Sequence, residues 1–243
     1  MRAFGIIGYP LGHSFSPDYF SEKFKTENIQ DASYEAFPLE EVSHFPLLIA
    51  QQVTLRGLNV TIPYKKSIIP YLNSLDPLAA KLNSVNTIKV QNGEMIGYNT
   101  DVEGFVESIK PLIHNKIKKA LVLGNGGSAQ SVKEGLRQIG IEFNIVSRNA
   151  NTGDHTYDNL SKALLSEYLL IINTTPLGMY PNIKGFPDLP YEAIGSEHLC
   201  FDLVYNPSET EFMKRSKVSG AMVANGAKML RIQAEAAWKI WNS

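Results

Sequence analysis

The chain has 243 residues, 44% of them hydrophobic, and 23 Lys and Arg balance 24 Asp and Glu for a formal net charge of −1. This charge disfavours a nucleic-acid partner, and no apolar run reaches the roughly 20 residues that a membrane span needs. Cys200 is the only cysteine, which excludes a disulfide framework and a cysteine-based metal cluster. With no secretory signal in MRAFGIIGYP, the composition predicts a cytoplasmic αβ protein without a membrane partner.

Strands and helices are predicted to alternate through the first third of the chain. In chain order, the pattern predicts a strand over 3–8, a helix capped by Ser16-Pro17, a strand over 33–37, a helix over 39–52 and a strand over 57–62. Asn92-Gly93 then predicts a hairpin over 86–98, because this dipeptide favours two-residue hairpin turns. This alternation predicts a mostly parallel sheet covered by helices.

A second alternating region follows a helix that is expected to start after Asn99-Thr100-Asp101. The boundary between the two regions is expected near 101–111. The predicted elements are a strand over 119–123, a helix over 128–139, strands over 142–146, 169–173, 199–204 and 221–224, and a closing helix over 227–241.

A glycine-rich loop lies between the predicted strand 119–123 and the helix after it. Gly124, Gly126 and Ala129 match the G-x-G-x-x-[GA] pattern of dinucleotide-binding turns. The first glycine permits the tight turn, the second lets a pyrophosphate approach the backbone, and the small alanine lets the helix pack close to the strand. The loop therefore predicts a dinucleotide site at a helix N-terminus.

The end of the next strand indicates which dinucleotide is bound. NAD sites usually carry an acidic residue there, but the only acid of this strand, Glu142, opens it, and the strand runs into Ser147-Arg148-Asn149. Arg148 can hold a 2′-phosphate through charge-assisted hydrogen bonds, which favours NADP. The alternative is a solvated surface arginine.

Polar clusters in the first region fall at strand ends, where sheets with helical crossovers bind ligands. They are Ser14 and Ser16 in GHSFSP, Asn59, Thr61 and Lys65 in NVTIPYK, Asn86 in SVNT and Asp101 in NTDVEG. Each has a structural explanation by itself, as a helix cap, a turn former or a solvated lysine. Together they supply hydroxyls, amides, a cation and a carboxylate, which suits a polyhydroxylated carboxylic acid.

Throughout its length, the sequence resembles the shikimate dehydrogenase family. The resemblance rests on ordered motifs: YPLGHSFSP at 9–17, NVTIPYK at 59–65, SVNT at 84–87, NTDVEG at 99–104, GNGGSA at 124–129, NTTPLGM at 173–179, DLVYNP at 202–207, Asn225-Gly226 and MLRIQA at 229–234. It implies reversible NADPH-dependent reduction of 3-dehydroshikimate to shikimate, in the shikimate pathway of aromatic amino-acid and chorismate biosynthesis.

The resemblance also implies an α/β fold of two αβ domains with a cleft between them. An N-terminal, mostly parallel αβ substrate domain takes 1–101 and 227–243, because the closing helix returns to it, and a Rossmann-type NADP-binding domain takes 102–226. A monomer or homodimer that acts on a small-molecule substrate is expected.

Functional residues are carried over by motif. Lys65 and Asp101 match the catalytic pair, in which an ammonium can protonate the alkoxide that forms when hydride reaches the ketone carbon. The residues matched to substrate binding are Ser14 and Ser16 for the carboxylate, Thr61, Asn86, Asp101 and Gln233 for ring hydroxyls, and Asn59 and Tyr205 for the pocket wall. The residues matched to the cofactor are Gly124, Gly126, Gly127, Ala129, Arg148, Thr174, Met179 and Gly226.

Two departures from the family pattern bear on the cofactor. The family usually follows its arginine closely with a second basic residue, whereas this chain continues Asn149-Ala150-Asn151-Thr152. The chain is also short for the family after Val146, which suggests that the nucleotide domain lacks an element. An NAD-using quinate/shikimate dehydrogenase and a non-catalytic NADP sensor remain as alternatives. The five scattered histidines indicate no metal site.

Overall fold

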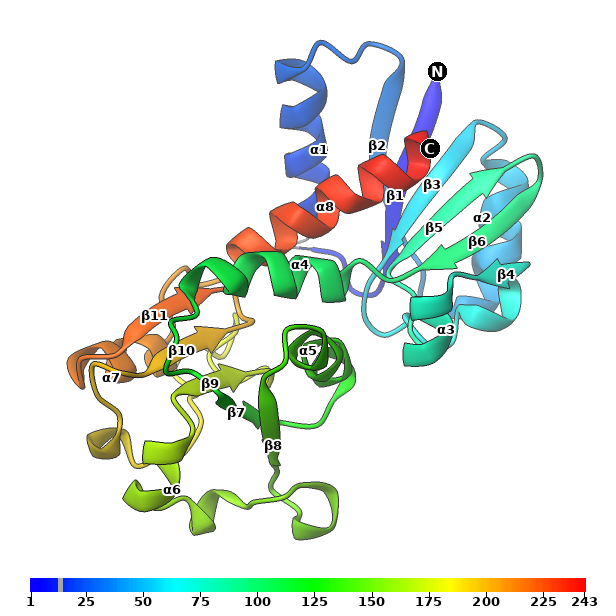
Figure 1. The fold of residues 1–243 in the computed structure, drawn as a ribbon. Helices are drawn as coiled ribbons and strands as arrows, with labels where there is room; N and C mark the ends of the chain where they lie inside the picture. The colour runs from blue at the N-terminus through cyan, green and yellow to red at the C-terminus, as the bar shows by residue number, and fades with distance from the viewer. Residues whose placement is uncertain (13–14) are drawn as a thin grey trace. The chain divides into compact units, whose positions relative to one another are not determined.

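The computed structural model describes residues 1–12 and 15–243, which form two compact units (Figure 1). Unit 1 contains Met1–Thr100 and Gln233–Ser243, and unit 2 contains Asp101–Ile232. Both ends of the chain therefore belong to unit 1. Compared with the limits expected from sequence, unit 2 also includes Asp101 and residues 227–232.

A six-stranded mixed sheet forms the centre of unit 1. Its strands follow the order β2 (Ala32–Pro38), β1 (Arg2–Gly8), β3 (Leu55–Val60), β5 (Thr87–Gln91), β6 (Glu94–Tyr98) and β4 (Ser74–Leu75). β1 is parallel to β2 and β3, β5 is antiparallel to β3 and β6, and β4 is parallel to β6. The predicted hairpin joins β5 to β6 through Asn92 and Gly93, at φ values of 54° and 82°, the left-handed region that a two-residue hairpin turn requires.

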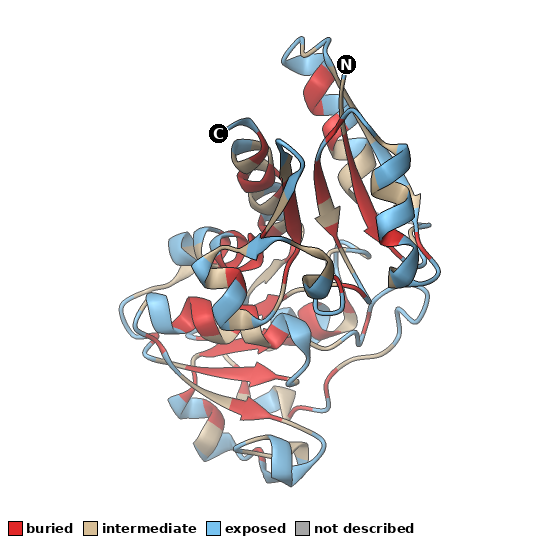
Figure 2. Cartoon of the chain, turned by 90° about the vertical axis from the view of Figure 1, so that its right-hand side faces the viewer, coloured by how far each residue is buried: buried red, intermediate tan, exposed pale blue. Residues whose placement is uncertain are grey.

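Helices cover both faces of this sheet. On one face, Phe4 of β1 packs with α1 (Phe15–Thr26) and with the end of α8 (Ala227–Asn242). On the other face, Ile7 packs with α2 (Phe45–Gln51) and α3 (Pro77–Leu82). Successive strand residues alternate between faces, so β1 supplies both cores, and buried residues lie along the strands and on the helices that cover them (Figure 2).

Trp241 fixes the end of α8 to the sheet of unit 1. Its ring stacks on Phe4 with centroids 4.9 Å apart, and its indole Nε1 donates a hydrogen bond to the Ile88 carbonyl over 3.0 Å. The ring lies directly over Gly57 of β3, where any side chain would collide with it. The absence of a side chain at Gly57 is therefore what lets α8 approach the sheet.

The sheet of unit 2 is entirely parallel. Its order is β11 (Met222–Asn225), β10 (Leu199–Asp202), β9 (Leu170–Asn173), β7 (Lys119–Leu123) and β8 (Glu142–Val146). Ala120 and Val122 of β7 pack with α4 (Asp101–Ile109) and α5 (Gly127–Gln138) on one face. Leu121 and Leu123 pack on the other face with α6 (Lys162–Glu167) and α7 (Glu211–Val218).

This arrangement is that of a dinucleotide-binding sheet without one edge strand. The usual six-stranded order is 3-2-1-4-5-6, and β8-β7-β9-β10-β11 corresponds to 2-1-4-5-6. Between β8 and β9 the described chain forms α6 and short 3-10 helices but no strand. The five-stranded sheet therefore has β8 at its edge.

Buried hydrogen bonds join the carboxyl ends of β9 and β10 to the start of α7. Asp202 accepts from the Asn173 side chain (3.0 Å), from the Val204 amide (3.0 Å) and from the Thr210 hydroxyl (2.6 Å). Asn173 in turn accepts from the amide (3.0 Å) and hydroxyl (2.6 Å) of Thr175. Burial raises the pKa of Asp202 to about 6, against these hydrogen bonds, which favour the carboxylate.

Some predicted elements differ from those observed. The helix expected over 39–52 is split into η1 and α2, because Pro46 has no amide hydrogen and starts a new helix. The strand expected over 57–62 is β3, which ends at Val60, and α1 begins at Phe15, so Ser16 lies in its first turn rather than at its cap. The connecting 3-10 helices are η1 (Val42–His44), η2 (Ile69–Tyr71), η3 (Lys110–Leu112), η4 (Ala150–Thr152), η5 (Tyr157–Asn159) and η6 (Tyr191–Ala193).

We expect Gly57→Ala to lower the free energy of unfolding by about 1–3 kcal/mol, because the added methyl group would push Trp241 off the sheet. The matched control is Gly195→Ala, where an added Cβ meets no atom within 4 Å. Urea unfolding of both variants measures the difference. Equal effects at the two positions would contradict the role given to the contact between Gly57 and Trp241.

Asp202 should make stability depend on pH. A carboxyl whose pKa rises on folding, here from 3.8 to about 6, contributes stability that is full below pH 4 and is lost as the pH rises through 6. We expect the excess free energy of unfolding of wild type over Asp202→Asn to fall by up to roughly 3 kcal/mol between pH 4 and pH 7. Denaturant unfolding at several pH values measures it, and a constant difference would contradict the raised pKa.

Candidate functional site

The turn that leaves β7 is held in an unusual backbone conformation. Gly124 has a φ of 95°, and its amide donates to the carbonyl of Val146 over 2.8 Å. A Cβ at Gly124 would lie 2.9 Å from Thr175 Cγ2 and 3.1 Å from Thr174 Oγ1. Glycine is therefore required both by the left-handed conformation and by the close approach of the β9 end.

The first turn of α5 presents its backbone to open space. The cap residue, Gly126, provides no side-chain hydrogen bond to the helix. A Cβ built at Gly126 or Gly127 meets no atom within 4 Å. First-turn amides that no side chain caps, together with the helix dipole, favour an anion at this point.

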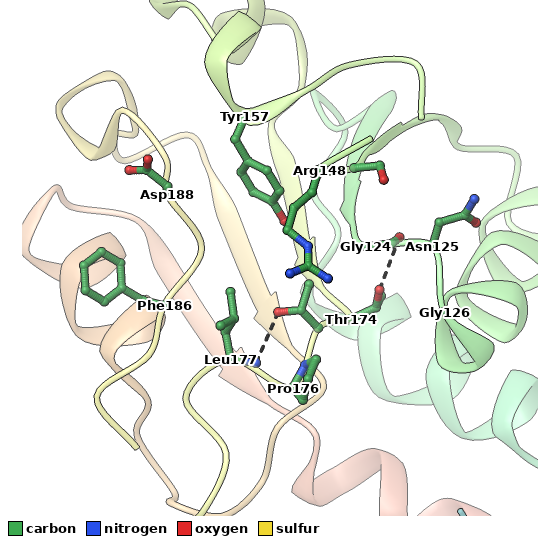
Figure 3. A pocket seen from close by; sticks show the side chains of 12 residues that line it. Gly124, Asn125, Gly126, Arg148, Tyr157, Thr174, Pro176, Leu177, Phe186 and Asp188 are labelled. Atoms are coloured by element: carbon green, nitrogen blue, oxygen red, sulfur yellow. Dashed lines mark hydrogen bonds between the residues drawn. The ribbon is translucent and has the colours of Figure 1, made fainter. Parts of the chain in front are cut away.

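This helix end opens onto a pocket of about 550 Å³ (Figure 3). The volume falls in the range of cofactor sites. The lining residues are Gly124, Asn125, Gly126, Ser147, Arg148, Tyr157, Thr174, Thr175, Pro176, Leu177, Phe186 and Asp188. They come from the carboxyl ends of β7, β8 and β9 and the segments that follow, which is where open parallel sheets bind ligands.

Arg148 provides the positive charge of this pocket. Its guanidinium points into the pocket on the side of Thr174, and Tyr157 lies next to it (Figure 3). Burial raises the pKa of the Tyr157 hydroxyl, and the positive charge of Arg148 opposes that rise. The preceding Ser147 hydroxyl lies 2.8 Å from the hydroxyl of Thr152, so the turn after β8 adds polar groups next to the guanidinium.

The predicted cofactor residues take two kinds of position. Gly124, Gly126, Arg148 and Thr174 line the pocket, and the Thr174 hydroxyl donates to the Leu123 carbonyl over 2.7 Å, which fixes its side chain. Four residues lie outside the lining: Gly127 in the first turn of α5, Ala129 on the buried face of the same helix, the exposed Met179, and Gly226, which packs against the Leu203 backbone.

In unit 1, hydrogen bonds link polar residues from five segments. The Tyr34 hydroxyl is hydrogen-bonded to Ser16 and donates to Asn59 Oδ1 over 2.7 Å. The side-chain nitrogen of Asn59 donates to the backbone carbonyl of Asn86 over 3.4 Å. The side-chain oxygen of Asn86 accepts from the backbone amide of Thr100 over 2.8 Å. The chain of contacts therefore holds three predicted substrate residues, Ser16, Asn59 and Asn86, in one fixed network.

Three further predicted residues of unit 1, Thr61, Lys65 and Gln233, lie in the segment after β3 and on α8. Thr61 follows β3 and donates its amide to the Ile7 carbonyl over 2.9 Å. Lys65 is half-buried in the next turn, and its carbonyl accepts from the Val85 amide over 2.7 Å, which ties it to the residue before Asn86. Gln233 is half-buried on α8, and Ser14 lies outside the described residues.

Two residues predicted to contact the substrate, Asp101 and Tyr205, belong to unit 2. Asp101 is the first residue of α4 and is buried, directly after Thr100 of the unit 1 network. Tyr205 follows β10, next to the Asp202 hydrogen bonds, and burial raises the pKa of its hydroxyl.

Several residues at both places were not predicted from the sequence. Tyr34 lies in the strand predicted over 33–37, but an aromatic residue in a strand gives no signal of a polar role until its neighbours are known. Tyr157, Phe186 and Asp188 come from irregular segments in which no motif was identified. Thr175 could have been predicted from the sequence, because it belongs to the NTTPLGM motif.

The described residues hold no group of three or more His, Cys, Asp or Glu side chains that could bind a metal ion. None of the helices in this part of the chain has the length and apolar character of a membrane span.

Comparison with known proteins identifies the family. A family model for the substrate-binding domain of shikimate dehydrogenase matches residues 6–88. The chain is 38% identical to the NADP⁺-dependent shikimate dehydrogenase of Halothermothrix orenii, covering 98% of this chain and 89% of that protein, and 36% identical to that of Carboxydothermus hydrogenoformans, covering 98% and 90%.

A solved structure shows the same fold. Shikimate 5-dehydrogenase from Thermus thermophilus, in complex with NADP(H) and shikimate, matches with a TM-score of 0.88 and 29% identity over 99% of this chain and 93% of that chain. Because sequence similarity of this level extends over nearly the whole chain, this protein belongs to the shikimate dehydrogenase family.

Proposed function

We propose that the protein is an NADP-dependent shikimate dehydrogenase, an oxidoreductase that reversibly reduces 3-dehydroshikimate to shikimate in the shikimate pathway. The observation that carries this conclusion is the open first turn of α5, which shares one pocket with the guanidinium of Arg148. Helix amides suit a pyrophosphate, and a guanidinium suits the 2′-phosphate that distinguishes NADP from NAD. The relatives named for NADP and the solved complex with NADP(H) and shikimate support the same activity.

The two domains are proposed to divide the ligands between them. The substrate domain, taken as 1–101 and 227–243, includes the segment matched by the substrate-binding family model. The NADP-binding domain, taken as 102–226, contains the parallel sheet and the pocket. Gly126, which lines the pocket, and Gly127 next to it carry no side chain that would screen the helix amides, which supports placing a cofactor phosphate here.

In the cofactor site, Gly124, Gly126 and Gly127 form the phosphate turn, and the small, fully buried Ala129 lets α5 pack against the sheet. Arg148 holds the 2′-phosphate. Thr174, Met179 and Gly226 are assigned to the rest of the cofactor by family resemblance. Thr174 has the strongest support, since it lines the pocket and is fixed by its hydrogen bond to Leu123.

In the substrate site, Ser14 and Ser16 hold the carboxylate, and Thr61, Asn86, Asp101 and Gln233 contact ring hydroxyls. Asn59 and Tyr205 line the pocket. The network through Tyr34 supports this set, because it fixes the side chains of Asn59 and Asn86 before any substrate arrives. Side chains that are already oriented lose less entropy on binding.

Lys65 and Asp101 are the proposed catalytic residues. NADPH, when bound, supplies the hydride for the ketone carbon. The Lys65 ammonium donates a proton to the oxygen that gains negative charge, and in the reverse direction the neutral amine accepts it from the hydroxyl. Asp101 accepts a hydrogen bond from the neighbouring hydroxyl and stabilises the ammonium form of Lys65 electrostatically.

We further propose that the enzyme works in the cytoplasm as a monomer or homodimer, without nucleic-acid or membrane partners. The buried free thiol of Cys200, the only cysteine, supports a reducing compartment. The net charge of −1 supports the absence of a nucleic-acid partner.

Lys65→Ala should lower kcat by roughly 10²–10⁴-fold with a smaller change in KM, because it removes the proton donor from the transition state. The matched control is Lys66→Ala, which removes an exposed ammonium from the next position and should leave turnover nearly unchanged. Steady-state kinetics with shikimate and NADP⁺ measures both variants. Near-native turnover of Lys65→Ala would remove Lys65 from the mechanism.

The cofactor and substrate assignments are tested together by following the absorbance of the reduced cofactor. Shikimate and quinate are each supplied with NADP⁺ and NAD⁺. We expect shikimate turnover with a kcat/KM about 10- to 150-fold higher for NADP⁺ than for NAD⁺, because only NADP⁺ gains the charge-assisted contact between its 2′-phosphate and Arg148. Equal values for the two cofactors would contradict the role of Arg148, and absence of turnover under all conditions would favour a ligand sensor.

A further inference from the structure

The turn after β8 contains one positive charge, whereas a 2′-phosphate can carry two negative charges. Such a phosphate carries up to two negative charges at neutral pH, like other phosphate monoesters. From Ser147 to Thr152 the only ionisable side chain is that of Arg148. A second cation, if the site has one, has to come from another part of the fold.

The side chain of Lys133, on α5, places an ammonium near the turn after β8. Its Nζ donates to the Asn125 side-chain oxygen over 3.1 Å, and Asn125 lines the pocket inside the phosphate turn. The amide of the same Asn125 side chain donates to the Thr152 carbonyl over 2.8 Å. Lys133 is thus connected both to the loop that begins α5 and to the turn that carries Arg148.

The surroundings of Lys133 disfavour its ammonium form, so an anion bound beside it would offset that cost. Burial lowers the pKa of its ammonium, Arg137 lowers it further, and only Asp154 acts in the opposite direction. The Asp154 carboxylate is itself engaged by the Ile145 amide over 2.7 Å. Among the described residues no ion pair joins Lys133 to a carboxylate, whereas Lys116, Lys119 and Lys214 each have one. A phosphate dianion would supply the missing partner.

We propose that Lys133 is a specificity-determining residue that supplies the second cation for the 2′-phosphate of NADP, from the helix rather than from the turn after β8. This inference rests on the proposed function, because it concerns the same cofactor. Asn125 orients the ammonium in the absence of ligand, and the 2′-phosphate binds between it and the guanidinium of Arg148.

A purely structural role for Lys133, bracing Asn125, predicts a different result. Loss of a brace would disturb the phosphate turn, which NADP and NAD share, and would weaken both cofactors alike. Loss of a contact to the 2′-phosphate weakens only ligands that carry it. Lys133→Gln separates the two roles, because it removes the charge and keeps a side-chain donor for Asn125, and Lys133→Arg restores the charge.

The test measures dissociation constants by calorimetric titration of the full-length protein. The ligands are NADP⁺, NAD⁺, adenosine 2′,5′-bisphosphate and adenosine 5′-monophosphate. For Lys133→Gln we expect roughly 10-fold weaker binding of the two 2′-phosphorylated ligands and less than about 2-fold change for the other two. Lys133→Arg should recover most of the loss. Lys118→Gln, at the opposite end of β7, is the matched control and should bind all four ligands as wild type does.

Equal weakening of all four ligands by Lys133→Gln, or none, would overturn the inference. Failure of Lys133→Arg to restore the 2′-phosphorylated ligands would do the same. The proposed function fails separately, and visibly in the wild type, if the unaltered protein binds NADP⁺ no more tightly than NAD⁺.

Discussion

The ligand pocket of unit 2 is built around one exposed stretch of backbone, the first turn of α5. Helix amides that no side chain caps are stable only in water or against an anion, so this turn has to stay open. The neighbouring sequence serves that requirement. Gly124 takes the left-handed conformation that turns the chain into the helix, and the fully buried Ala129 lets α5 pack closely enough to aim its dipole at the pocket.

In both units, polar side chains at the strand ends are held by hydrogen bonds to one another. Polar side chains that a ligand will contact must be held in place without leaving buried donors or acceptors unsatisfied. In unit 1 the Asn59 side chain accepts from the Tyr34 hydroxyl and donates to the Asn86 backbone carbonyl, and the Asn86 side chain is hydrogen-bonded to Thr100. In unit 2 Asn173 and Asp202 do so, and their hydrogen bonds fix Thr175 at the pocket wall. In both units, hydrogen bonds among polar residues thus hold the side chains at the strand ends in place.

How far the sequence predicted the structure depends on how local each signal was. The strands β7 and β8 were predicted with their observed limits, because short apolar runs bounded by turn residues are complete within a few residues. The short helices α3, α6 and α7 were missed. Their signals were present in the caps Asp76, Ser161 and Thr210, which accept from amides three residues on, but helices this short have little periodicity. Tyr34 and Tyr157 were missed because their roles come from neighbours distant in sequence.

The sequence by itself determined the alternating αβ plan, the glycine turn with its helix, the arginine after β8 and the order of motifs that identifies the family. Each of these signals is carried by short stretches of residues within about 20 positions of one another, which residue type and local backbone preference are enough to specify. Only the tertiary structure decided that the sheet of unit 2 has five strands, that Gly57 makes room for Trp241, and that Asn125, the partner of Lys133, is held by Thr152. Those facts depend on packing and hydrogen bonds between segments far apart in the chain, which no local pattern records.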